Sequence, residues 1–124
     1  MLISKRAHGR VMVIHLAGKF EGGPDRDKLL ATTKLVLEDG FREIVVSFLG
    51  VRFLSSNGVG IMIAMKALVD AVDARLVLCN FNERALSVVH ILRLEEVIPV
   101  AKNIQAARAL LRHRGGDEQA EARA

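Results

Sequence analysis

Two adjacent serines, Ser55 and Ser56, are the side chains best placed to do chemistry in this sequence. They follow an apolar run that ends at Leu54, and residues 57–60 (Asn-Gly-Val-Gly) lead into a second apolar run. This pattern is typical of a buried strand, a short polar turn and the start of a helix. In an open α/β sheet, sites lie beyond the carboxyl ends of the strands. The turn at Ser55 and Ser56 is therefore the candidate site.

Two physical roles are open to these serines. Serine is a favoured helix N-cap, because its side-chain oxygen accepts an amide proton that the first helical turn leaves unpaired. That role requires no function, and Ser56 would then be only a cap. Alternatively, a phosphate on Ser56 would lie at the positive end of the helix and add roughly −1.5 to −2 charges without melting it. A partner packed on the turn would meet new bulk and charge, so the modification would act as a switch.

Other kinds of site have little support. No pair of carboxylates and no Ser/His/Asp or Cys/His set can be assembled from the sequence. The residues around Ser56 do not form the Gly-x-Ser-x-Gly elbow of hydrolases. The Gly58–Gly60 pair lacks the third glycine and the downstream acid of a dinucleotide-binding fingerprint. There is no metal-ligand spacing of Cys or His, and Cys79 is expected to be a small buried hydrophobic residue. We therefore predict a protein that is not an enzyme and needs no metal or cofactor.

Composition limits the class of partner. The chain has 124 residues, 51% of them hydrophobic, which suffices for one domain with a real core. Only 4% are aromatic, with no Trp, so stacking platforms for nucleic-acid bases are nearly absent. The net charge of +4 is dispersed. We expect the basic residues Arg108, Arg112, His113 and Arg114 to complement the dipole of a terminal helix. No run approaches the ~20 apolar residues of a membrane span, so the default expectation is a cytoplasmic protein.

The elements that must position the serine turn alternate along the chain. The predicted order is strand 2–7, strand 11–17, loop 18–24, helix 25–39, strand 43–49 extended by 51–54, helix 57–72, strand 75–79, a helix capped by Asn82, strand 97–100, and a helix from Asn103 to Arg112. The first two strands read as a hairpin, and the later alternation predicts an α/β fold with a mainly parallel sheet. Pro99 favours an edge strand. We predict one domain over 1–114 and a disordered tail over 115–124.

The residues around the serines resemble the signature of the STAS domain. Phe53 to Gly60, after the strand 44–49, is similar to that signature, and more narrowly to bacterial anti-sigma factor antagonists. Residues 16–21, 76–80 and 92–100 support the resemblance, which extends from about Leu2 to Arg112. It implies the same α/β fold.

The resemblance also implies a function. In the family, the unphosphorylated antagonist binds an anti-sigma factor with a serine-kinase fold and so releases the sigma factor. The kinase then phosphorylates a serine of the turn and breaks the complex. Aligned on Gly58, that serine is Ser56. The expected protein is thus a bacterial phosphoprotein that regulates transcription by binding an anti-sigma factor. Its partner-binding residues would be Glu21, Ser55, Ser56, Asn57, Gly58 and Val59, with the bare Gly58 backbone letting the partner approach closely.

The sequence departs from the family pattern at acidic positions. The Asp that usually precedes the acceptor is Ser55, the Asp often found in the preceding strand is Ser47, and the acid of the first loop is Glu21. The reduced acidity supports an alternative, a constitutive structural subunit of a stressosome-like scaffold or a lipid-transport complex, in which Ser56 is only a cap. A small-ligand sensor is a third possibility, without a dedicated phosphate loop to support it. The partner's identity and the oligomeric state stay open.

Overall fold

The chain folds into a sheet covered by helices. The structure, a computed structural model, describes residues 1–20 and 23–112. Its elements, in chain order, are β1 (Leu2–His8), β2 (Val11–Phe20), α1 (Pro24–Glu38), β3 (Glu43–Leu54), α2 (Ser56–Asp70), β4 (Arg75–Cys79), α3 (Glu83–Ile91), a 3₁₀ turn (Leu94–Glu96) and β5 (Val100–Ala101). A last helix covers residues 104–112. The predicted tail, together with His113 and Arg114, lies outside the described residues.

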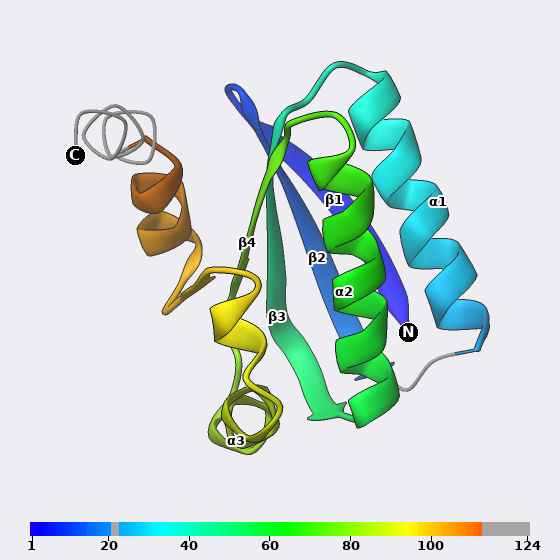
Figure 1. The fold of residues 1–124 in the computed structure, drawn as a ribbon, viewed down its shortest axis with the longest axis vertical. Coiled ribbons are helices and arrows are strands. Elements are labelled where there is room, and N and C mark those ends of the chain that lie inside the picture. Colours follow the sequence, from blue (N-terminus) through cyan, green and yellow to red (C-terminus); the bar gives the residue numbers. More distant parts are fainter. Residues whose placement is uncertain (21–22, 113–124) are drawn as a thin grey trace.

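The strands lie side by side in chain order, from β1 to β5 (Figure 1). β1 and β2 pair antiparallel as a hairpin, whereas β2–β3, β3–β4 and β4–β5 are parallel. This arrangement confirms the predicted α/β class and the mainly parallel sheet. The carboxyl ends of β2, β3 and β4 therefore share one edge of the sheet, and the turn at Ser55 lies there.

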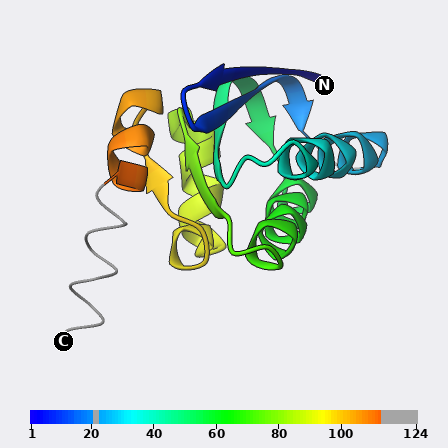
Figure 2. The ribbon, with the colours of Figure 1, turned by 90° about the horizontal axis from the view of Figure 1, so that it is seen from above.

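Helices pack on both faces of the sheet (Figure 2). The larger of two apolar clusters lies on one face and the smaller on the other. The larger apolar cluster joins β2 and β3 to α1, α2 and α3, with Phe20, Phe48 and Met62 among its fully buried side chains. The smaller cluster lies on the opposite face, where Ala107 and Leu111 of the last helix cover valines of β2, β3 and β4. Because both faces are covered, the central strands are nearly all apolar, as in other parallel sheets.

Three predicted elements have a boundary that differs from the structure by two residues or more. The loop expected at 18–24 is partly strand, because Gly18 and Phe20 pair with Val51 and Leu54 and so extend β2. α2 begins at Ser56 and ends at Asp70, rather than spanning 57–72. The strand expected at 97–100 is only Val100–Ala101. Proline has no N–H to donate, and pairing begins with the Pro99 carbonyl, which accepts from the Leu78 N–H at 3.0 Å.

Three helix ends agree with the sequence prediction: the end of α1 and the starts of α3 and of the last helix. Gly40 follows α1 with φ of 97°, a conformation that glycine adopts without steric cost. The Asn82 side chain accepts from the Ala85 N–H at 2.7 Å and caps α3. Asn103 accepts from the Ala106 N–H at 2.8 Å at the start of the last helix. As predicted, β5 is an edge strand of this sheet.

Candidate functional site

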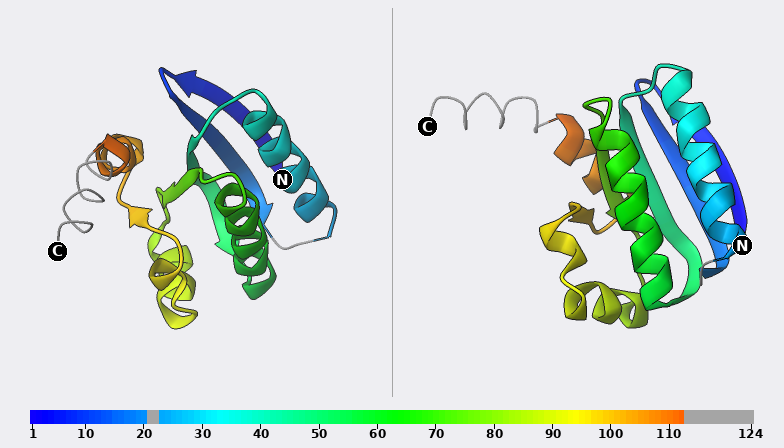
Figure 3. Two further views of the ribbon diagram at one scale, coloured as in Figure 1. Left: turned by 45° about the horizontal axis from the view of Figure 1, so that its top comes forward. Right: turned by 45° about the vertical axis from the view of Figure 1, so that its right-hand side comes forward.

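The second half of β3 brings the candidate site to the sheet edge. Its pairing with β2 shifts register twice, between His15 and Ala17 and again between Gly18 and Lys19. Such irregularities bend a strand and increase its twist, and β3 curves toward the start of α2 in both views of Figure 3. Gly50 lies at the first shift, where an added Cβ would lie 2.7 Å from the Cβ of Ala17. The bend ends at Leu54, directly before the serine turn.

Ser55 fixes the start of α2. Its backbone is extended, and its Oγ accepts from the Gly58 N–H at 3.2 Å, as an N-cap does. The Ser55 hydroxyl and the Ser55 N–H each donate to the Phe20 carbonyl at 3.4 Å. The turn is thus attached to the end of β2. Capping belongs to Ser55, which corrects the alternative in which Ser56 serves as the cap.

Ser56 is the first residue of α2 and is exposed to solvent. Within the described part of the chain, its hydroxyl has no hydrogen-bond partner. Asn57 beside it is also exposed, and the first turn of α2 carries no acidic residue. The structure therefore separates the two serines: one is committed to the turn and the other faces solvent at the positive end of the helix.

A shallow hollow of about 300 Å³ adjoins Ser56. It lies between the start of α1 and the first turns of α2, and is lined by Gly23, Arg26, Ser56, Asn57, Gly60 and Ile61. Arg26 is the cationic side chain of this hollow. Sequence reasoning missed Arg26, because nothing in its neighbourhood along the chain marks it. Only the packing of α1 beside α2 brings it to the serine turn.

Gly58 and Val59 lie beneath this surface rather than on it. Val59 is 4% exposed and belongs to the core. A Cβ on Gly58 would lie 2.7 Å from the Phe20 carbonyl oxygen and 2.8 Å from Leu54 Cδ1. The absent side chain of Gly58 thus accommodates the chain's own interior, which corrects the expectation that it lets a partner approach. Glu21, the remaining predicted contact, lies outside the described residues.

The position at which the family often carries Asp is an interior one here. Ser47 is 1% exposed, and its Oγ accepts from Asn80 Nδ2 at 3.0 Å and from the Leu49 N–H at 3.4 Å. Burial of the neighbouring Cys79 raises the pKa of its thiol from 9.0 to about 12, and a hydrogen bond with Ser47 acts in the opposite direction. The prediction that Cys79 is a buried residue is confirmed.

The described residues contain no cluster of side chains suited to a metal site. No group of three or more His, Cys, Asp or Glu side chains among them could hold a metal ion. In the same part of the chain, no helix is both long enough and apolar enough to cross a bilayer.

The family model for the STAS domain matches residues 3–107. The chain therefore belongs to the STAS domain family, which confirms the resemblance drawn from the serine turn. No curated protein sequence matches the chain closely enough to count as a relative.

Solved structures share the fold at low sequence identity. The unphosphorylated anti-sigma factor antagonist SpoIIAA is 22% identical, with a TM-score of 0.71, over 92% of this chain and 97% of its own. Phosphorylated SpoIIAA of Bacillus, described as a cell fate determinant, is 21% identical, with a TM-score of 0.65, over 88% and 99%. An anti-sigma factor antagonist from Mycobacterium paratuberculosis is 18% identical, with a TM-score of 0.77, over 90% and 93%. At these identities the likeness establishes the fold.

Proposed function

We propose that this STAS domain is a bacterial, cytoplasmic anti-sigma factor antagonist. It binds a serine-kinase-type anti-sigma factor, and phosphorylation of Ser56 switches that binding off, so the protein regulates sigma-factor-dependent transcription. It acts by binding a partner rather than by catalysis. Two of the similar folds described above are named as anti-sigma factor antagonists, and one of them is known in a phosphorylated form. Those names motivate the proposal.

The observation that carries the proposal is that the two serines have different roles: Ser55 caps the helix and Ser56 faces solvent. The Ser55 hydroxyl accepts from the Gly58 N–H and donates to the Phe20 carbonyl, so it fastens the turn. Ser56 is exposed at the first position of α2. A kinase can therefore modify Ser56 without removing the cap, and the fold survives the modification. A switch requires this combination.

The surroundings of Ser56 suit a phosphate. The helix N-terminus favours a negative charge, and α2 has no acidic residue in its first turn to oppose one. Arg26 lines the same hollow and supplies a guanidinium, which binds phosphate oxygens well. A phosphate drawn toward Arg26 and the helix would alter the exposed surface around Ser56 and Asn57. A partner that fits the neutral surface would then lose contact.

The absence of an acidic residue at position 47 and its absence at position 55 have different consequences for this function. Ser47 is buried and bound to Asn80, so the lack of a carboxylate there leaves the partner-facing surface unchanged. Ser55 replaces an acid next to the acceptor, but it also provides the cap. The contact surface that we propose consists of Ser56 and Asn57, together with Glu21 because the family resemblance implies it. Gly58 and Val59 support it from below, and Ser55 holds its geometry.

A pull-down from the native host tests the proposal, with wild type, Ser56→Asp and Ser56→Ala as parallel baits. We expect a kinase-fold anti-sigma factor on wild type and Ser56→Ala, and at least a tenfold loss of it on Ser56→Asp, because a single added charge at a docking surface opposes binding. Equal capture by all three baits would contradict the switch. Capture of transporter or scaffold subunits by all three would support the constitutive structural role instead.

A further inference from the structure

A second polar hollow lies at the end of the sheet opposite Ser56. It has a volume of about 520 Å³ and adjoins the β1–β2 turn, the starts of β3 and β4, and the last helix. Figure 1 shows the hairpin turn and the start of α2 at opposite ends of the molecule. The charged and titratable side chains that line the hollow are His8, Arg10, Glu43, Arg75, Arg108 and Arg112. Basic residues that are dispersed along the sequence are therefore gathered by the fold.

The hollow carries an excess of positive charge. Four guanidinium groups face one carboxylate, which leaves three positive charges when His8 is neutral. That carboxylate is already engaged, because Arg75 Nη2 donates to Glu43 Oε2 at 2.5 Å and to the Leu111 carbonyl at 2.7 Å. Within residues 1–20 and 23–112, no ion pair neutralises Arg10, Arg108 or Arg112. Concentrated charge of one sign raises the local concentration of counter-ions.

Two of these arginines also have buried donors without acceptors. Arg75 Nη1 and Arg108 Nε are both inaccessible to solvent and have no hydrogen-bond partner in the described part of the chain. Leaving a buried donor unpaired costs folding free energy, so such groups in a native protein call for an explanation, for example a bound ion. A guanidinium only donates. An acceptor that drew these side chains toward it would pair both donors, and the charge favours an anion.

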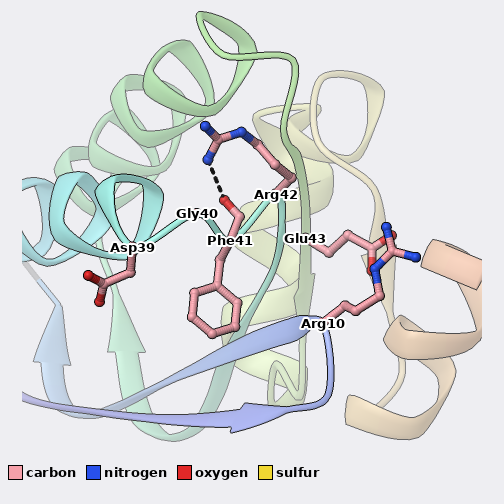
Figure 4. Close-up of a pocket in the computed structure, with 6 residues that line it drawn as sticks. All are labelled: Arg10, Asp39, Gly40, Phe41, Arg42 and Glu43. Carbon is pink, nitrogen blue, oxygen red and sulfur yellow. Dashed lines mark hydrogen bonds between the residues drawn. The ribbon is translucent and has the colours of Figure 1, made fainter.

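A smaller neighbouring hollow, of about 250 Å³, shares Arg10 and Glu43 with the hollow of about 520 Å³. In Figure 4 the side chains of Arg10 and Glu43 extend in the same direction, away from Asp39. Arg42, which lines the smaller hollow, is already hydrogen-bonded within the protein, since its Nη1 donates to the carbonyls of Leu37 at 2.9 Å and Phe41 at 2.8 Å. The guanidinium groups available to a ligand are thus those of Arg10, Arg108 and Arg112, because Arg75 Nη1 is inaccessible to solvent.

We propose that this arginine hollow binds a small molecule that carries two or more phosphate groups. Guanidinium groups pair with phosphate oxygens through two parallel hydrogen bonds, which a halide cannot accept. A single phosphate would leave most of the hollow and most of the charge unmatched. Binding there involves neither Ser56 nor its partner surface, so the site stands or falls independently of the phosphorylation switch.

The test is a titration of the isotope-labelled full chain with pyrophosphate at low ionic strength, followed by backbone amide chemical shifts. We expect saturable shifts confined to residues 8–11, 43, 75 and 104–112, with the Ser55–Asn57 turn unmoved. Arg108→Met should weaken binding roughly tenfold or more, as expected for a lost hydrogen bond to a charged group. Arg84→Met is the matched control, because it removes the same charge from an exposed site on α3 and should leave affinity unchanged.

Two further arms complete the test. Vesicles containing phosphatidylglycerol distinguish a lipid headgroup from a soluble phosphate; binding to vesicles without binding to pyrophosphate would overturn the proposal. Equal weakening by Arg108→Met and Arg84→Met, or shifts scattered over the surface, would show attraction by net charge alone and would also overturn it. If Arg108→Met does not fold, shift mapping on the wild type and the exposed Arg112→Met variant decide the question.

Discussion

Ser55 and Ser56 are neighbours with opposite environments, and this contrast defines the site at the scale of residues. The hydroxyl of Ser55 is held between the Gly58 N–H and the Phe20 carbonyl, whereas Ser56 faces solvent. The contrast follows from the geometry of a helix start. The residue before the first helical turn can cap it, and the next residue points outward. A phosphate at Ser56 is therefore compatible with an intact helix, whereas one at Ser55 would remove its cap.

This division predicts unequal effects of alanine on stability. Ser55→Ala should lower the free energy of unfolding by about 1 kcal/mol, the usual cost of a lost serine cap. Ser56→Ala should change it by less than about 0.5 kcal/mol, because an exposed side chain without a partner contributes little. Urea unfolding of both variants measures the difference. Equal destabilisation by the two substitutions would contradict the assignment of the cap to Ser55.

The two glycines of the turn give a second matched pair. Gly58→Ala would place a Cβ 2.7 Å from the Phe20 carbonyl oxygen, and we expect it to destabilise the fold by about 1–3 kcal/mol. Gly60→Ala meets no atom of the described residues within 4 Å and should stabilise α2 by about 0.5–1 kcal/mol, since alanine is the better helix former. Thermal or urea unfolding reads both. A Gly58→Ala variant as stable as wild type would show that Gly58 has room for a side chain.

Much of the residue-scale picture could be predicted from sequence, because capping is local. The starts of helices at Asn82 and Asn103 and the end of the first helix near residue 39 all follow from the residues around them. Local rules did not reveal what Gly58 touches, since Phe20 is distant along the chain and reaches Gly58 only through the pairing of β2 with β3. The same holds for Arg26, which lines the same hollow as Ser56 only because α1 packs beside α2.

At the scale of elements, β3 determines where the site lies. Its two register shifts against β2 carry the strand past Gly50 to Leu54, and α2 starts one residue later. The sequence predicted an interruption at Gly50, but the structure keeps one continuous strand. A glycine is needed at position 50 because a side chain there would collide with Ala17, and not because the strand breaks there. Whether a glycine interrupts a strand depends on the neighbouring strand with which it pairs, and the sequence of one segment does not identify that neighbour.

Four of the five residues of β4 are buried, including its last residue, Cys79. The burial of Cys79 should make the stability of the fold depend on pH. Burial raises the pKa of the Cys79 thiol from 9.0 to about 12. Between these values the unfolded chain has lost the thiol proton and the folded chain still holds it. Unfolding therefore becomes easier as pH rises above about 9, and below that pH the thiol contributes no pH dependence. Stability should fall on this account only in the alkaline range.

Urea unfolding of wild type and Cys79→Ala at pH 8 and pH 10.5 measures this effect. The variant has a cavity and is less stable at both pH values, so the relevant quantity is the change with pH. We expect wild type to lose more stability than Cys79→Ala between the two. Parallel losses would mean that the thiol ionises as readily in the folded chain as in the unfolded one.

At the scale of the whole molecule, the parallel sheet separates two polar regions. The carboxyl ends of β2 and β3 present Ser56 and Asn57 beside Arg26, and the amino ends of β3 and β4 border the arginine hollow. The alternation of strands and helices predicted the first region, because the site of an open α/β sheet lies beyond the carboxyl ends of its strands. It could not predict the second, whose arginines come from the hairpin, β4 and the last helix.

The most direct test of the central claim is to map phosphate on the protein isolated from its host, using tandem mass spectrometry that separates Ser55 from Ser56. We predict phosphate on Ser56 and none on Ser55, in a fraction that changes with the conditions that activate the sigma factor. Phosphate on Ser55, or none on either serine while the anti-sigma factor is present, would contradict the account. The exposed serine at the start of α2 would then be a surface residue without a switching role.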